Sequence, residues 1–186
     1  MKDHLTWKEE GKKVVFTCPV FNVEERYSRS PFDKLKTYSV INASDWAIII
    51  PELDTEQGRR FVMVRQWRHG ALELSLEFPG GVIEKGEDAQ AAAARELKEE
   101  TGYSANKIVK LGVFSPNPAI MSNKVHFFLA LNLSPPTGQE LDEDEYVEVE
   151  TVPYEEVFSG LGKPPYIHAL MGTAMALYLA YKKLTI

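Results

Sequence analysis

Cysteine is almost absent from this chain of 186 residues, which contains only Cys18. An intrachain disulfide is therefore excluded, and the composition fits a reducing, cytoplasmic location. Cations are also in the minority, with 21 lysines and arginines against 27 acidic residues and a formal net charge of -6. Because this charge repels polyanions, nucleic acid is an unfavoured partner, and an anionic ligand would need local cations.

Long apolar runs are missing as well. The nearest, residues 166–181, is shorter than the ~20 residues of a membrane-spanning helix and contains His168, Gly172 and Thr173. It predicts a buried amphipathic helix instead. The polar start, MKDHLTWKEEGKK, does not have the pattern of a signal peptide. We therefore expect no membrane association and a cytoplasmic protein.

What the chain does contain is a series of strand patterns with a few helices between them. Residues 5–30 predict a β-hairpin with a turn near Gly11. Further strands are predicted in KTYSVI, DWAIIIPEL, FVMVRQWRHG, LSLEFP, IVKLGVFS, KVHFFLALNL and YVEVETV. Helices are predicted near residues 88–101, 153–158 and 165–183. The absence of regular strand–helix alternation indicates an α+β domain.

The most informative segment is RELKEETG, residues 95–102, with three glutamates in five positions. The spacing places Glu96, Glu99 and Glu100 on one side of a helix, where like charges cost a few tenths of a kcal/mol per pair. Clustered carboxylates supply the oxygen ligands that Mg²⁺ prefers, and a bound cation would offset the repulsion. A solvated acidic surface is the alternative interpretation.

The other side of the same predicted helix carries small and apolar residues. Ala91, Ala94 and Leu97 are expected to form the stripe that packs on a sheet. On this interpretation the acidic side is unobstructed. Asp88 and Gly102 are suited to the start and the end of the helix.

The spacing around the glutamates is more specific than the glutamates themselves. Gly81 is followed by five residues and Glu87, and seven residues later by RELKEETGY. This pattern resembles the Nudix box, whose seven fixed letters are all present, with Leu97 and Tyr103 at the apolar places. A chance match is on the order of one in a million. The resemblance, over residues 81–103, implies the Nudix fold, a mixed β-sheet sandwiched between α-helices.

In this chain the fold would have an N-terminal β-hairpin extension. We expect residues 1–45 to form that extension and to serve dimerisation, and residues 46–186 to form the Nudix hydrolase domain. Members of the branch resembled most closely are homodimers, so a homodimer is expected.

The resemblance also implies a hydrolase that cleaves a nucleoside diphosphate joined to another group, using Mg²⁺ or alternatively Mn²⁺. The implied metal ligands are Glu96 and Glu100, with Glu99 close by, and the backbone carbonyl of Gly80. Arg95 matches the residue that orients the glutamates, and Glu99 is also a catalytic candidate.

The flanking segments resemble the ADP-ribose and nucleoside diphosphate sugar hydrolases of the family. These segments are VRQWRHG, LSLEFPGGVIEKGE and Pro118, fifteen residues after Tyr103. Ala119 and Ile120 stand where the dinucleoside polyphosphate branch has a tyrosine. The expected substrate is therefore a small nucleotide, with ADP-ribose first, cleaved to a nucleoside monophosphate and a sugar phosphate.

The same branch implies the residues that would contact this substrate. Arg68 would bridge phosphate oxygens, and Arg65, expected on the opposite face of its strand, is the weaker candidate. Trp46 would stack on the base. Glu143 is the first candidate for the general base and Glu145 the second, with Glu145 also a candidate metal ligand. The alternatives are a surface arginine, a structural tryptophan and a solvated acidic turn.

Two other functions remain open at this point. One is hydrolysis of nucleoside triphosphates or of RNA 5′ ends, although the net charge disfavours long RNA. The other is a non-catalytic sensor that binds ADP-ribose, although the intact set of box glutamates disfavours it. Turnover in the presence of Mg²⁺ separates the sensor from the enzymes.

Overall fold

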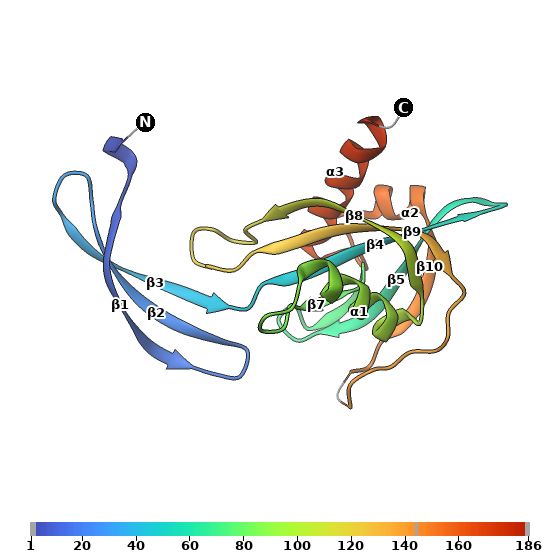
Figure 1. Ribbon diagram of the computed structural model, residues 1–186, viewed down its shortest axis with the longest axis horizontal. Helices are drawn as coiled ribbons and strands as arrows, with labels where there is room; N and C mark the ends of the chain where they lie inside the picture. The colour runs from blue at the N-terminus through green and yellow to red at the C-terminus, as the bar shows by residue number, and fades with distance from the viewer. Residues whose placement is uncertain (1–2, 144, 185–186) are drawn as a thin grey trace. The chain divides into compact units, whose positions relative to one another are not determined.

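The computed structural model describes residues 3–143 and 145–184, and the chain divides into two compact units. The N-terminal unit consists of residues 1–45 and 115–124, and the core unit of residues 46–114 and 125–186 (Figure 1). The chain therefore leaves the core unit once, after Phe114, and re-enters it at Val125.

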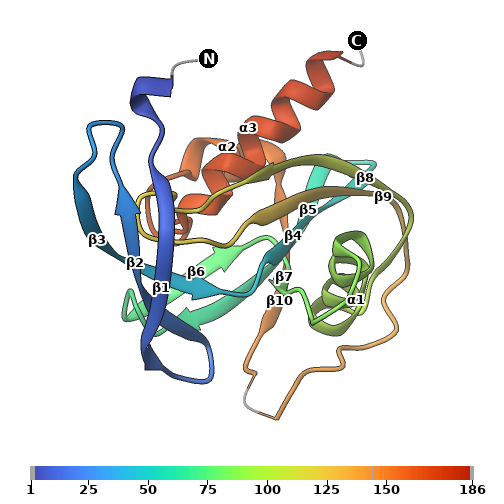
Figure 2. The same cartoon turned by 60° about the vertical axis from the view of Figure 1, so that its left-hand side comes forward.

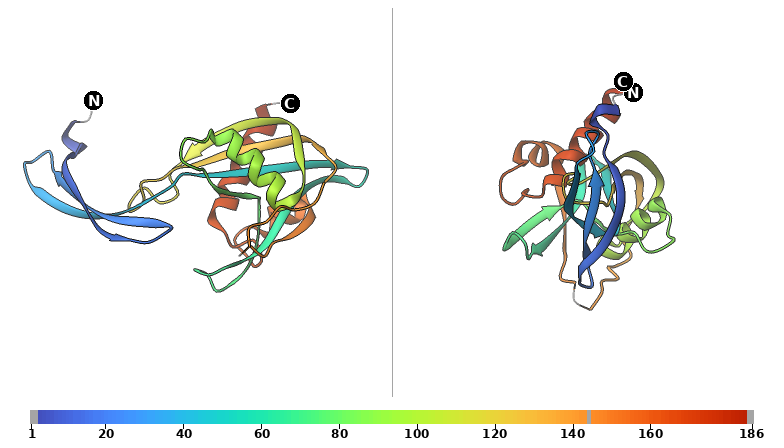
Figure 3. Two further views of the ribbon diagram at one scale, coloured as in Figure 1. Left: turned by 60° about the horizontal axis from the view of Figure 1, so that its bottom comes forward. Right: turned by 90° about the vertical axis from the view of Figure 1, so that its left-hand side faces the viewer.

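The N-terminal unit is a three-stranded antiparallel sheet in the order β1-β2-β3. Its elements are η1 (Asp3–Leu5), β1 (Lys8–Thr17), β2 (Phe21–Arg29) and β3 (Leu35–Ala43). The strands of this unit are the blue arrows in Figure 3. The predicted hairpin is present, but its predicted turn near Gly11 is wrong. Gly11 lies at a register shift inside β1, and the turn follows Thr17, closed by a bond of 3.0 Å from Cys18 N to Phe21 O. Pro19 explains this position, because proline cannot donate to a strand ladder.

Residues 115–124 complete this unit by lying against β3. Ile41 N donates to Ile120 O at 2.7 Å, and Ser122 N donates to Ile41 O at 3.0 Å. Little of the unit is buried. Across its described residues only Glu24 and Asn123 are buried, and many large apolar side chains are exposed. These exposed residues are Leu5, Trp7, Val14, Val15, Phe16, Val20, Phe32, Leu35, Tyr38 and Ile120.

The core unit is built on a seven-stranded sheet with the path β10-β5-β4-β9-β8, to which β6 adds beside β5 and β7 beside β4. The strands are β4 (Trp46–Thr55), β5 (Gly58–Arg68), β6 (Glu73–Glu77), β7 (Gly80–Val82), β8 (Ser104–Phe114), β9 (Val125–Ser134) and β10 (Glu148–Pro153). The pairing of β4 with β9 is parallel and the other pairings are antiparallel. The sheet is therefore mixed, as expected.

Three helices cover the two faces of this sheet. They are α1 (Ala89–Thr101), α2 (Tyr154–Gly160) and α3 (Ala169–Leu184). Figure 2 shows α1 on one side of the sheet, with α2 and α3 on the other. The predicted α+β sandwich is thus confirmed. Within the described part of the chain, no helix combines the length and apolar character needed to cross a membrane.

Neighbouring residues of β4 serve opposite faces of the sheet, as strand geometry requires. Ile50 packs in the cluster that includes Phe61 and Tyr178, on the side of α3. Ile49 packs in the cluster that includes Leu97, on the side of α1. The central strands are therefore buried on both faces, and α1 is held rigidly against the sheet.

The predicted packing stripe of α1 is partly wrong. Ala92, Ala93 and Leu97 are buried against the sheet, whereas Ala91 is exposed and Ala94 half-buried. The helix is rotated by about one residue, or roughly 100°, from the expected orientation. The ends of α1 are as predicted: Asp88 accepts from the backbone N–H groups of two first-turn residues at 2.9 and 3.1 Å, and Gly102 (φ 74°) closes the helix in the left-handed conformation.

Candidate active site

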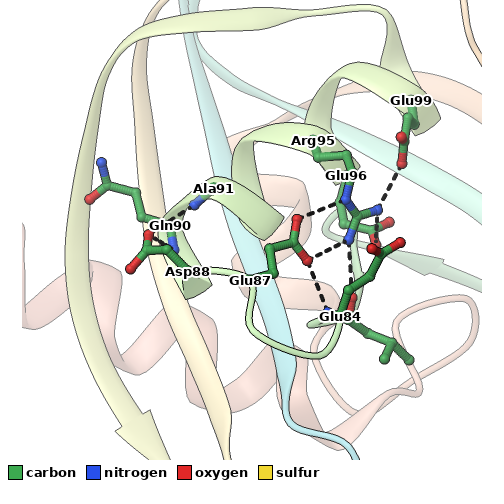
Figure 4. Close-up of polar contacts among 9 residues, drawn as sticks. Glu84, Glu87, Asp88, Gln90, Ala91, Arg95, Glu96 and Glu99 are labelled. Atoms are coloured by element: carbon green, nitrogen blue, oxygen red, sulfur yellow. Dashed lines mark hydrogen bonds and ion pairs between the residues drawn. The ribbon is translucent and has the colours of Figure 1, made fainter.

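Arg95 is the centre of a carboxylate cluster on α1 (Figure 4). Its guanidinium binds both oxygens of Glu87, at 3.0 and 3.1 Å. It also binds one oxygen each of Glu96 and Glu99, both at 2.9 Å, and the carbonyl of Val82 at 3.1 Å. These five bonds match the five N–H groups of an arginine. Arg95 therefore fixes three carboxylates and ties β7 to α1.

Glu100 lies beside this cluster and is only 4% exposed. Burial raises the pKa of Glu100 to about 8, and the negative charges of Glu96 and Glu145 act in the same direction. The backbone N–H of Gly80 donates to Glu100 Oε2 at 2.9 Å, and this hydrogen bond acts to lower the pKa. Burial also raises the pKa of Glu96. The rotation of α1 that buries its alanines therefore buries two carboxylates as well.

Two glycines make the approach of β7 to α1 and β4 possible. A Cβ atom at Gly81 would lie 2.5 Å from Glu96 Oε1, and one at Gly80 would lie 2.2 Å from the backbone oxygen of Ala47. Both separations are far below van der Waals contact. Gly80 therefore requires glycine for packing, in addition to any part that its carbonyl has in metal binding, whereas a side chain at Gly81 would displace the end of the Glu96 side chain.

The acidic cluster has the chemistry of a site for a hard divalent cation, although its carboxylates are not arranged as a complete coordination sphere. Among residues 3–143 and 145–184, no three histidine, cysteine or acidic side chains converge on one point as metal ligands do. Arg95 binds Glu96 and Glu99, and Gly80 binds Glu100. The buried, mutually repelling carboxylates nevertheless fit Mg²⁺ or a similar ion, since a cation would favour their charged forms.

A pocket of about 260 Å³ is lined in part by Gly80 and Gly81, the two glycines that lie against this cluster. Its lining consists of Trp46, Ala47, Ile48, Arg68, Glu77, Phe78, Gly80, Gly81, Val82, His168 and Leu170. Two predicted substrate contacts, Trp46 and Arg68, are thus brought together beside Gly80. Because Gly80 binds Glu100 and Gly81 touches Glu96, the pocket and the acidic cluster share a wall.

Arg65 does not join this pocket. It pairs with Glu150 of β10 and lines a separate groove with Glu145. Its position three residues before Arg68 places it on the opposite face of β5, as the strand period predicts. The two predicted arginines therefore serve different surfaces.

The acidic loop before β10 is anchored to the C-terminal end of α1. Glu140 N donates to Glu99 O at 2.9 Å. The side-chain amide of Gln139 donates both to Glu100 O, at 2.7 Å, and to Val147 O, at 3.2 Å. These bonds satisfy carbonyls that a helix end leaves unpaired. They also hold the two ends of the loop close to the buried glutamates.

Of the two predicted general bases in this loop, Glu145 is the one whose charge raises the pKa of both Glu96 and Glu100. Its carboxylate accepts a bond of 3.2 Å from Asp142 N. Glu143 and Glu145 are both exposed on this loop. The electrostatics therefore associate Glu145 with the acidic cluster.

Two pocket residues were missed in the sequence. Glu77, 4% exposed, accepts two bonds from Arg68, at 2.8 and 2.7 Å. Burial acts to raise the pKa of Glu77, but the bonds and charge of Arg68 outweigh it and hold the pKa below its usual range. A charged residue inside the apolar strand LSLEFP was the signal for it. In the sequence, His168 only interrupts an apolar run, because its place in the pocket depends on a contact between Pro165 and distant β6.

Comparisons with known proteins agree with this arrangement. The NUDIX domain family model matches residues 44–172. The chain is 44% identical over 103 residues to the ADP-ribose pyrophosphatase of Bacillus subtilis (strain 168), an alignment that covers 55% of this chain and 55% of that protein. The chain thus spans about half the length of this curated relative.

Two further similarities cover more of the chain. The ADP compounds hydrolase NudE of Escherichia coli (strain K12) is 30% identical over 136 residues, 73% of this chain and 70% of that protein. A crystal structure described as an ADP compounds hydrolase superposes with a TM-score of 0.85 at 24% identity, covering 100% of this chain and 98% of that one. The second similarity establishes a shared fold.

Proposed function

Because this chain belongs to the Nudix family, we propose that it hydrolyses the diphosphate bond of a nucleoside diphosphate sugar, with ADP-ribose as the leading substrate. The observation that carries the proposal is the pair of buried carboxylates, Glu96 and Glu100, sharing a wall with a pocket. The names of the relatives, ADP-ribose pyrophosphatase and ADP compounds hydrolase, support the choice of substrate.

Mg²⁺ is the proposed metal, with Mn²⁺ as the alternative. Glu96 and Glu100 would hold it, with Glu99 and the carbonyl of Gly80 as further ligands. A bound divalent ion would neutralise the diphosphate and lower the pKa of water. Arg95 is proposed as the residue that orients the glutamates, because it binds Glu96 and Glu99 directly.

Trp46 and Arg68 are proposed to contact the substrate in the pocket that they line. Trp46 offers an aromatic surface for stacking. Arg68 uses two of its five N–H groups on Glu77 and would offer others to a phosphate oxygen. Arg65 lines a separate groove and is not proposed as a contact in this pocket.

We propose Glu145 as the general base, ahead of Glu143, because its charge acts on Glu96 and Glu100. In the reaction the carboxylate takes a proton from water as the water oxygen attacks one phosphorus. The bond from that phosphorus to the bridging oxygen breaks. The products are a nucleoside monophosphate and a sugar phosphate.

A homodimer is proposed from the N-terminal unit, where the exposed apolar side chains include Trp7, Phe16 and Tyr38. Such residues on a thinly packed sheet are typical of a protein–protein contact. A cytoplasmic location is proposed from the single cysteine. Sedimentation velocity of the wild type and of Phe16→Glu tests the dimer, since a charge in an apolar interface should shift the population toward monomer.

The function is tested by a hydrolysis panel with ADP-ribose, GDP-mannose, UDP-glucose, a dinucleoside polyphosphate and a nucleoside triphosphate, with and without Mg²⁺. We expect the highest kcat/KM for ADP-ribose, with AMP as the nucleotide product. Preference for the triphosphate or the dinucleotide would overturn the substrate. Tight binding of ADP-ribose without turnover of any compound would identify a sensor instead.

A further inference from the structure

His168 is held over the pocket by contacts on both sides of it in the sequence. Before it, the carbonyl of Pro165 accepts from Leu76 N at 3.0 Å. After it, the sulfur of Met171 accepts from Phe78 N at 3.2 Å, a buried contact. The segment leading into α3 is thus fastened at two points to the strand end that contains Glu77. His168 therefore has a defined position in the pocket wall, with 31% of its side chain exposed.

The protonation of the imidazole is also defined. His168 Nδ1 accepts a hydrogen bond of 3.1 Å from the backbone N–H of Leu170, at the start of α3. A nitrogen that accepts this bond cannot carry a proton, so the proton of the neutral ring is on Nε2. Burial lowers the pKa of His168 and keeps the ring neutral, against the opposing charge of Glu77. The side chain is therefore a neutral Nε2–H donor.

This donor does not find its acceptor in Glu77. His168 Nε2 is 3.8 Å from Glu77 Oε2, beyond the limit of about 3.2 Å for a good N–H···O hydrogen bond. The carboxylate of Glu77 already accepts two charged bonds from Arg68. Among the residues that the structure describes, no acceptor lies within hydrogen-bond distance of Nε2, so this N–H group is available to a ligand in the pocket.

The charge of the pocket wall indicates what that ligand is. Arg68 and Glu77 cancel, and His168 is neutral, so these three side chains together carry no net charge. The remaining N–H groups of Arg68 can bind one phosphate oxygen, but the balanced pair cannot neutralise a dianionic diphosphate, which would need divalent cations held by the acidic cluster. A neutral group with acceptor atoms and a flat face suits a wall that offers one neutral donor together with Trp46.

We propose that His168 is a specificity-determining residue, whose Nε2–H group donates a hydrogen bond to an acceptor atom of the substrate's nucleoside. This inference rests on the proposed function and adds to it the half of the substrate that the pocket takes. The leaving sugar phosphate lies outside the reach of His168 in this assignment.

Two substitutions separate recognition by His168 from its role at the start of α3. Asparagine places an oxygen near the position of Nδ1 and is a good helix-capping residue, but it has no group at the position of Nε2. Glutamine reaches the position of Nε2 with an N–H donor and gives up the cap. His168→Asn therefore removes the proposed contact, and His168→Gln removes the structural one.

The measurements are KM and kcat for ADP-ribose, the inhibition constants of AMP and of ribose 5-phosphate, and the melting temperature. For His168→Asn we expect KM and the constant for AMP to rise about five- to tenfold, with kcat and the melting temperature near those of the wild type. The constant for ribose 5-phosphate should not change. For His168→Gln we expect a lower melting temperature with KM close to the wild-type value.

An unchanged inhibition constant for AMP in His168→Asn would overturn the assignment, and so would an increase confined to ribose 5-phosphate. Either result is distinct from failure of the proposed function, in which the wild-type protein would release no AMP from ADP-ribose. The wild-type hydrolysis panel therefore precedes the variants.

Discussion

Arg95 and Arg68 both bind buried glutamates in the core unit, but the charge around them is balanced differently. Arg95 forms ion pairs with Glu87, Glu96 and Glu99, and the buried Glu100 lies beside them. Arg68 serves Glu77 alone. Both arginines give rigid, multiply bonded geometry. The first cluster has more carboxylates than cations, an excess that protonation of Glu100 or an added cation would relieve, whereas the charges of the second pair balance within the protein.

The comparison indicates that the Arg95 cluster and the Arg68–Glu77 pair have different roles. A surplus of buried charge destabilises the fold and is retained where it has a chemical use, such as binding a metal. A balanced pair fixes the wall of a pocket, and the N–H groups of Arg68 that Glu77 does not use stay free to bind a phosphate oxygen. The proposed reaction needs both, since the diphosphate requires positive charge and the nucleoside requires a shaped surface.

The largest expected effect is on kcat and comes from removing one carboxylate of the acidic cluster around Arg95. Glu100→Gln keeps the size of the side chain and its bond from Gly80 N but removes a metal ligand. We expect kcat for ADP-ribose to fall about a thousandfold at saturating Mg²⁺, with an unchanged circular dichroism spectrum. Glu84→Gln, at an exposed glutamate of the same loop–helix segment, is the control and should keep wild-type activity. Near wild-type kcat in Glu100→Gln would remove this residue from the metal site.

The next largest effect is expected at Glu145, the loop glutamate whose negative charge acts on Glu96 and Glu100. Glu145→Gln should lower kcat about a hundredfold, as loss of a general base does, with little change in the Mg²⁺ concentration needed for half-maximal rate. Glu143→Gln is the matched control on the same loop and should stay within a few-fold of the wild type. If the loss appears in Glu143→Gln instead, the base lies two positions earlier. A large shift in Mg²⁺ dependence for Glu145→Gln would make that residue a metal ligand.

Breaking the balanced pair should affect stability. Arg68→Met leaves the buried carboxylate of Glu77 without its partner, and we expect a loss of about 2 kcal/mol in the free energy of unfolding, measured in urea. This is less than for a fully buried pair, because the side chain of Arg68 is 39% exposed. The double variant Arg68→Met/Glu77→Met should recover most of the loss. A double variant as unstable as the single one would show that the pair is not the cause.

The smallest expected effect is a difference in how stability depends on pH between Glu100, in the Arg95 cluster, and Glu77, in the Arg68 pair. It is measured as the melting temperature in the presence of EDTA. The folded-state pKa of Glu100 is raised from 4.5 to about 8, so its contribution is fully present below pH 4.5 and is lost as the pH rises through about 8. The pKa of Glu77 is lowered from 4.5, so its contribution is present above that pH and is lost as the pH falls.

Metal-free Glu100→Gln should therefore gain an advantage in melting temperature over the wild type that grows from about pH 5 to about pH 8 and persists above it, whereas Glu77→Gln should lose its deficit only in acid. Parallel pH profiles for the two variants would contradict the difference in charge balance. Addition of Mg²⁺ should reduce the advantage of Glu100→Gln, because only the wild type has the full ligand set.

Local patterns made α1 and its surroundings predictable. Asp88, Gly102 and the spacing from Gly81 to Tyr103 act within a few turns of one helix, so the sequence states them directly. The orientation of α1 about its own axis was predicted less well. Exposure of Ala91 and burial of Glu96 depend on how closely β7 approaches, which requires Gly80 and Gly81 together with the sheet behind them.

Partners distant in the sequence could not be predicted. The pairing of Arg68 with Glu77 depends on the antiparallel register of β5 and β6. The position of His168 depends on the bond between Leu76 and Pro165. The turn was predicted at Gly11 instead of Pro19, because a glycine in a strand pattern fits a bulge as well as a turn.

The return of residues 115–124 to the N-terminal unit has a consequence for modularity. The backbone of Ile41 bonds both Ile120 and Ser122, so the first strands and a segment some eighty positions later form one structural module. A truncation before Trp46 would leave residues 115–124 without the strand that pairs them. Transfer of this module to another protein would therefore require both segments to be moved together.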